Sequence, residues 1–139
     1  MKGRDVDYIT KFFYEASKLR KTEKELQSFV EGFIEDYNEY LSQDDKNEVT
    51  TKYCHDTLQC LNQVVFLTTT INTLKNEWQK LQYVKAGTVL PDWDDRKVSV
   101  VKREVKEKIW KYKKEVSRIC KNLTKAYLLL SHTHPEINK

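Results

Sequence analysis

The chain has 139 residues and a formal net charge of +4, and its residues are 39% hydrophobic and 33% charged, with only three glycines and two prolines. This balance is too apolar for a disordered chain and too charged for a membrane-embedded one, and the length suits one domain. No apolar run approaches the ~20 residues of a membrane span, and charges interrupt the N-terminus where a signal peptide has its apolar segment. We therefore expect a single soluble domain over residues 1–139, located inside the cell in the cytoplasm or the nucleus.

Apolar residues recur every three or four positions in the first third of the chain, with one polar gap at Glu23. This spacing is that of one buried helix face. It predicts a first helix over about residues 5–42. The apolar positions are Ile9, Phe12, Ala16, Leu19, Leu26, Val30, Phe33, Tyr37 and Tyr40.

The same periodicity predicts two further helices. The second spans about residues 46–86, starts at an N-cap formed by Asp45 with Glu48 three residues later, and ends near Gly87 in a left-handed cap. Its β-branched centre keeps the helical spacing and is predicted as helix. The third spans about residues 93–131 and leaves a tail at 132–139. Short connections make neighbouring helices antiparallel, so the predicted fold is all-α, an elongated up-down-up bundle of three long antiparallel helices.

Pro91 and Trp93 stand between the second and third predicted helices. Proline is excluded from a helix interior and extends the residue before it. Asp92 is then placed to cap the third helix, with Asp94 and Asp95 in its first turn. Trp93 has two interpretations, a lid that closes the end of the bundle or a docking residue for a partner, and the lid is preferred.

Charge is distributed unevenly along the chain. Residues 5–45 hold 11 acidic and five basic side chains, a net of −6, and residues 94–125 hold 12 basic and five acidic ones, a net of +7. The members of a basic stripe are three or four residues apart on the third helix, and they are Lys111, Lys114, Arg118, Lys121 and Lys125. If the first and third helices run parallel, the acidic end of the first compensates the basic stripe. An acidic protein partner, nucleic acid or an anionic membrane are the alternatives.

The sequence contains no constellation for catalysis. It has no glycine-rich phosphate loop, nucleophile-elbow motif or zinc-protease motif. His132, His134 and Glu136 supply too few preorganised ligands, so we expect no metal and no cofactor. The cysteines lack metal or redox spacing and sit among apolar residues, which predicts reduced packing thiols at Cys54, Cys60 and Cys120. An enzyme is therefore not expected.

Aromatic residues are numerous, and several lie at the edges of the predicted helical stripes. Aromatic side chains at such positions suit anchoring to a partner. The candidate partner-binding residues are Trp93, Trp110, Tyr14, Tyr53 and Tyr83. We expect a non-catalytic helical protein–protein interaction module, an adaptor or a subunit of a larger complex. The alternatives are an electrostatic binder of nucleic acid or anionic membrane through the basic stripe, and a homodimeric structural bundle.

Overall fold

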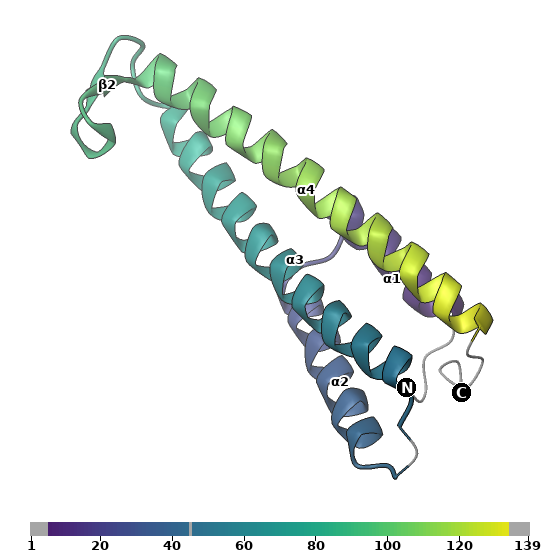
Figure 1. The fold of residues 1–139 in the computed structure, drawn as a ribbon. Coiled ribbons are helices and arrows are strands. Elements are labelled where there is room, and N and C mark those ends of the chain that lie inside the picture. Colours follow the sequence, from purple (N-terminus) through teal and green to yellow (C-terminus); the bar gives the residue numbers. More distant parts are fainter. Residues whose placement is uncertain (1–5, 45, 134–139) are drawn as a thin grey trace.

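Four α-helices dominate the part of the chain that the computed structural model describes, residues 6–44 and 46–133 (Figure 1). Their bounds are α1 Val6–Ser17, α2 Glu23–Leu41, α3 Glu48–Leu81 and α4 Val98–Thr133. A short hairpin joins α3 to α4, with β1 at Val89–Leu90 paired antiparallel to β2 at Arg96–Lys97. The all-α class is confirmed. The predicted count of three long helices is wrong, because the first of them is two helices.

A tight backbone turn ends α1 before the chain enters α2. The N–H of Leu19 donates to the carbonyl of Ala16 at 3.0 Å, and the N–H of Arg20 donates to that of Glu15 at 2.9 Å. This pair of bonds is the Schellman pattern of a helix C-terminus, and it places Leu19 in the left-handed region at φ 57°. Glycine is the usual residue at that position, so the break carries no glycine signal in the sequence.

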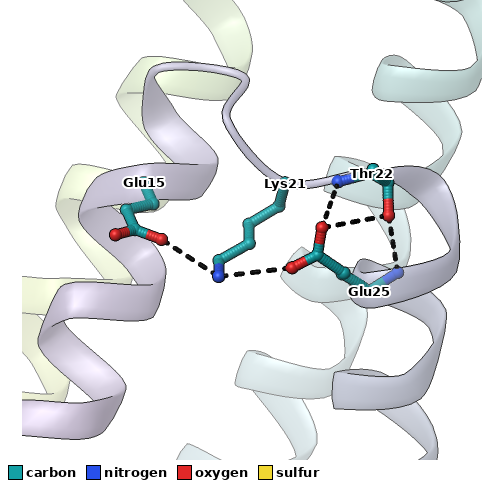
Figure 2. Close-up of polar contacts among 4 residues, drawn as sticks. All are labelled: Glu15, Lys21, Thr22 and Glu25. Atoms are coloured by element: carbon teal, nitrogen blue, oxygen red, sulfur yellow. Dashed lines mark hydrogen bonds and ion pairs between the residues drawn. The ribbon is translucent and has the colours of Figure 1, made fainter.

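A capping box starts α2 (Figure 2). The Thr22 hydroxyl accepts from the Glu25 N–H at 3.1 Å, and the Glu25 carboxylate accepts from the Thr22 N–H at 3.3 Å. Lys21 joins the two helices across the turn, because its Nζ lies 3.0 Å from a carboxylate oxygen of Glu15 and 3.4 Å from one of Glu25. The turn, the cap and these ion pairs together hold α1 folded back against α2.

The helices run alternately up and down. α1 packs against α4, α2 against α3, and α3 against α4 (Figure 1). At one end of the α2–α3 pair the Asn72 side chain donates to Glu23 at 2.9 Å, and at the other end the Tyr40 hydroxyl donates to the Asn47 carbonyl at 3.0 Å. The predicted parallel run of the first and third helices is wrong for α1, which is antiparallel to α4 (Figure 1).

The main core lies where all four helices meet. Phe12 of α1 stacks on Phe29 of α2 with ring centroids 4.0 Å apart, and Phe13 meets the same ring edge-on at 5.9 Å. Val64 of α3 and Val116 of α4 are fully buried in the same cluster. Burial of each large apolar side chain contributes about 1.5–3 kcal/mol. Most apolar positions predicted for the first helix are therefore core positions, although two helices supply them.

α3 and α4 continue beyond α1 and α2 as a two-helix arm that ends in the hairpin (Figure 1). A separate core fills this arm and consists of Leu81, Val98, Val101 and Val105. Trp93 reaches back from the hairpin and packs against this core. Since a tryptophan carries one of the largest apolar surfaces of any side chain, it covers the end of a core that only two helices enclose. This placement agrees with the lid interpretation of Trp93.

The ends of α3 differ from the prediction. The helix begins after Asn47, whose side chain is the N-cap, whereas Asp45 lies outside the described residues. The β-branched centre is helical, as predicted. α3 ends at Leu81, and Gly87 adopts its left-handed φ of 88° in the loop beyond instead of at the helix terminus.

The start of α4 also differs from the prediction. Asp92 lies in the 3₁₀ turn Pro91–Trp93 and does not cap α4, which begins at Val98. Asp94 and Asp95 are not in the first turn of the helix but have left-handed φ values of 58° and 57°. Aspartate tolerates this region better than most residues, because its short polar side chain bonds locally. These two aspartates reverse the chain within the hairpin.

Candidate partner-binding surface

The five aromatic candidates separate into exposed and packed residues. Tyr14 is 56% exposed, Trp110 61% and Tyr83 92%. Tyr53 is buried, with its ring centroid 6.1 Å from that of Tyr127, so its prediction as a partner-binding residue is not compatible with its place in the core. Trp93 is partly buried as described above. Of these three exposed candidates, Tyr83 follows the end of α3, Tyr14 lies on α1 and Trp110 lies on α4.

Trp110 stands on the outer face of α4, away from the core positions of that helix. One turn later, the Lys114 Nζ lies 3.9 Å from the centroid of the Trp110 ring, in a cation–π contact. All five members of the basic stripe are exposed. Lys121 follows at helical spacing, so it shares a face of α4 with Trp110 and Lys114. The result is a basic helix face with a tryptophan at its N-terminal end.

A groove of about 270 Å³ runs between α1 and α4 along the same part of the molecule. Phe13 and Cys120, both almost fully buried, form its apolar floor. Three lysines stand around it, Lys18 from α1 and Lys121 and Lys125 from α4. The remaining lining residues are Thr10, Tyr14, Ser17 and Thr124. The groove therefore combines an apolar floor with positive charge at its rim.

The acidic helix does not neutralise this rim by direct pairing. α2, which carries most of the acidic residues of the first third, packs on α3. Within residues 6–44 and 46–133, no ion pair joins an acidic residue of α2 to a member of the basic stripe. Arg118 pairs with Glu115 of its own helix, and this contact raises the pKa of Arg118. The acidic residues expected to compensate the stripe lie mainly on α2, which does run parallel to α4 but packs on α3 instead of beside the stripe (Figure 1).

A second, larger hollow of about 530 Å³ lies between α1 and α2 and differs in its electrostatics. Lys21 bridges Glu15 and Glu25 at its edge (Figure 2). The hydrogen bond from Lys21 lowers the pKa of Glu15, and the same bond raises the pKa of Lys21. Two glutamates line this hollow, whereas no acidic residue of the described chain lines the groove between α1 and α4, so that groove is the better candidate for an anionic ligand.

The three cysteines are free thiols that pack inside the bundle. Burial raises the pKa of Cys54 to about 11 and that of Cys120 to about 12. Cys60 is half-buried, and its pKa is also raised, chiefly by burial. A thiol in this state is a weak nucleophile at neutral pH, since the thiolate is the reactive form. Their packing role agrees with the sequence-based prediction.

The described residues contain neither a cluster suited to a metal ion nor a helix suited to spanning a membrane. Within them, His, Cys, Asp and Glu side chains form no group of three that could hold a metal ion. His134 and Glu136, two of the weighed metal ligands, lie outside the described residues, as does the tail from 134 onward. No helix in residues 6–44 and 46–133 has the length and hydropathy to cross a bilayer. Comparison of the chain with family models, curated proteins and solved structures gives no match.

Sequence reasoning found the basic stripe and Trp110 but missed the groove beside them. Lys18, Phe13 and Thr124 line the groove, and no local pattern marks them. The groove forms because α1 returns along α4, so its location depends on the break after Ser17. The signal for that break was Thr22-x-x-Glu25, a capping-box pattern that lies in the polar gap of the apolar stripe.

Proposed function

We propose that this chain is a non-catalytic helical interaction module that binds an acidic, amphipathic segment of another protein. The binding surface is the outer face of α4 from Trp110 to Lys125 together with the groove between α1 and α4. The observation that carries the proposal is the groove itself, an apolar floor of Phe13 and Cys120 inside a rim of lysines. A partner that offers only charge would leave the apolar floor unused.

The dimensions of this surface fit a helical ligand of about four turns. Trp110 and Lys125 are 15 positions apart on α4, which corresponds to roughly 22 Å along the helix axis. An amphipathic helix in such a groove presents apolar anchors at three- and four-residue spacing and carboxylates beside them. We expect one anchor in the groove beside Tyr14, one against Trp110, and carboxylates near Lys114 and Lys121.

Nucleic acid and anionic membrane are the second candidate class. The net charge of +7 over residues 94–125 and the exposed Trp110 favour them, because phosphate contacts and ring stacking use the same residue types. Such binding weakens steeply with salt, since it releases counterions. Binding of an acidic amphipathic helix depends on salt less, because part of its free energy comes from buried apolar surface.

The test is an NMR titration of ¹⁵N-labelled protein with four probes. The first is a synthetic peptide of about 20 residues with Leu and Glu at helical spacing, and the second has the same composition in scrambled order. The third is oligothymidylate, and the fourth is vesicles of phosphatidylserine and phosphatidylcholine. The proposal predicts that the patterned peptide shifts the amides of Tyr14, Ser17, Lys121 and Thr124, and that the scrambled peptide does so at least about tenfold more weakly.

Two variants sharpen the result. Lys121→Glu should weaken binding of the patterned peptide about tenfold, because it reverses a charge at the groove rim. Lys52→Glu makes the same change at an exposed position of α3 away from the groove and should leave binding within about twofold. Equal binding of both peptides, or binding of oligothymidylate or vesicles alone, contradicts the proposal and favours the electrostatic alternative.

A further inference from the structure

The two-helix arm has an open face, on the side of α3 and α4 where α2 and α1 pack in the rest of the molecule (Figure 1). α2 begins at Glu23, which bonds Asn72, and α3 continues uncovered beyond that contact. Gln79 follows Asn72 by seven positions, and Lys102 precedes Cys120 of the groove by 18, so each continues the covered side of its helix. The open face consists of Lys75, Gln79 and Gln82 from α3 and Lys102, Lys106 and Lys113 from α4.

Two contacts across the arm show that side chains from both helices share the open face. The Lys102 Nζ donates to the side-chain oxygen of Gln82 at 3.3 Å. Lys75 and Lys113 are close enough for their charges to interact, since burial lowers the pKa of Lys75 and the charge of Lys113 lowers it further. Lys75 and Lys102 are half-buried, and the other four residues of the face are exposed. α3 and α4 therefore present one continuous basic surface here.

The four lysines of the open face have no acidic partner. None of them forms an ion pair within residues 6–44 and 46–133. The acidic residues that α3 and α4 carry in the arm are Glu77, Glu104 and Glu107, and each lies about 100° or more around its helix from these lysines. Glu77 pairs with Lys80, and Glu104 pairs with Arg96 of the hairpin. Positive charge is therefore gathered on the open face without compensation.

An exposed tyrosine and side-chain amides border the lysines. Tyr83 follows α3, and its side chain is 92% exposed, the highest value among the large hydrophobic residues described. Tyr83 lines a hollow of about 570 Å³ together with Gln79 and Gln82 of the open face. A tyrosine ring that projects into water is a platform on which a base can stack, and amides donate and accept hydrogen bonds as base edges do.

We propose that the open face binds single-stranded nucleic acid, with phosphates along its four lysines and a base stacked on Tyr83. Charge complementarity selects the ligand class, because lysines without acidic neighbours attract a polyanion. All six residues of the face are lysine or glutamine, so it offers no apolar anchor to an amphipathic helix or to a bilayer. A single strand is required rather than a duplex, since only an unpaired base can stack on Tyr83.

Fluorescence anisotropy of a labelled oligothymidylate of about 12 nucleotides tests this binding. Four phosphate contacts on a single strand predict that the logarithm of the association constant falls with the logarithm of salt concentration with a slope of about −3. An oligoglutamate of the same charge should bind at least about tenfold more weakly, because it has no base to stack on Tyr83. A wild type that shows no binding at about 50 mM salt, or equal binding of the oligoglutamate, overturns the proposal.

Two pairs of variants locate the site. Lys106→Glu should weaken oligothymidylate binding about tenfold, whereas Lys108→Glu, an exposed position on the opposite side of α4, should change it less than about twofold. Tyr83→Ala should weaken binding at least about fivefold through loss of stacking. Its control is Phe66→Ala, which removes an exposed ring from α3 outside the open face and should have no effect. Equal effects within either pair contradict the proposed site.

The inference does not rest on the proposed binding of an acidic peptide, because the open face and the groove are separate surfaces. In NMR titrations oligothymidylate should shift the amides of Gln79, Gln82 and Lys106, whereas the patterned peptide should shift those around the groove. Shifts from oligothymidylate at Lys121 and Lys125 instead would overturn the inference and leave the peptide result standing. Oligothymidylate shifts on the open face without any binding of the peptide would overturn the proposed function alone.

Discussion

Replacement of Trp93 by alanine tests how the hairpin is attached to the two-helix arm. Trp93 is partly buried and packs on the arm core that contains Leu81 and Val101. Truncation of a buried tryptophan to alanine costs about 3–5 kcal/mol, so a partly exposed one should cost about 2–3 kcal/mol of unfolding free energy. In a domain of this length 1 kcal/mol corresponds to roughly 4 °C. The variant should therefore melt about 10 °C below the wild type.

The matched control is Trp110→Ala, which removes the same side chain from an exposed position of α4. Since surface substitutions change stability by about 0.5 kcal/mol or less, this variant should melt within about 2 °C of the wild type. Thermal and urea unfolding followed by circular dichroism at 222 nm measures both. A Trp93→Ala variant as stable as the wild type, or a Trp110→Ala variant equally destabilised, would refute the assignment of Trp93 as a packed lid.

Three further predictions concern the helix break, the loop glycine and the thiols. Thr22→Ala should lower the free energy of unfolding by about 1 kcal/mol, because it removes the N-cap of α2. The control Thr69→Ala, inside α3, should leave the free energy of unfolding unchanged or raise it slightly. If both variants raise it, the first helix is continuous. Gly87→Ala should lower the free energy of unfolding by roughly 1 kcal/mol, because Gly87 has a left-handed φ of 88°, which an alanine adopts only with strain. Steric clash does not contribute, since no atom lies within 4 Å of the added Cβ. An unchanged urea midpoint would argue against the left-handed conformation of Gly87. A thiol reagent at neutral pH should modify Cys60 well before Cys120, and equal rates would contradict the burial of Cys120.

Helical periodicity was sufficient to predict the fold class and most of the core. Phe33, Val64 and Val105 each stand in a three- and four-residue apolar pattern, and each is buried. The pattern is reliable because a helix face that leaves water recurs at that spacing whatever the neighbouring element is. For the same reason the pattern does not reveal where one helix ends and another begins.

The break between α1 and α2 shows this limit. Ala16, Leu19 and Leu26 keep an apolar stripe going across it, since Leu19 packs against the core from the turn itself. A leucine in the left-handed region is uncommon, so the usual glycine signal is missing. The capping box from Thr22 to Glu25 was the local signal, and the polar gap at Glu23 coincided with it.

The sequence predicted the α4 side of the candidate site but not its α1 side. Its α4 side follows from spacing within one helix, which the sequence shows directly. Its α1 side depends on which helices become neighbours after the break, and that is set by long-range packing of Phe12 and Phe13 on Phe29. The exposure of Tyr83 and the burial of Tyr53 likewise depend on where α4 lies relative to α3.

The return of α1 along α2 and α4 underlies the groove, and a distance between spin labels tests it most directly. Lys11→Cys and Ser28→Cys, in a Cys60→Ser background, place labels on two residues that line the same hollow between α1 and α2. In the folded-back arrangement the labels should lie within roughly 15 Å and broaden the spectrum by dipolar coupling. A distance near 25 Å between the two labels corresponds to 17 residues of uninterrupted helix. That result would show a continuous first helix, and the groove on which the proposed function rests would not exist.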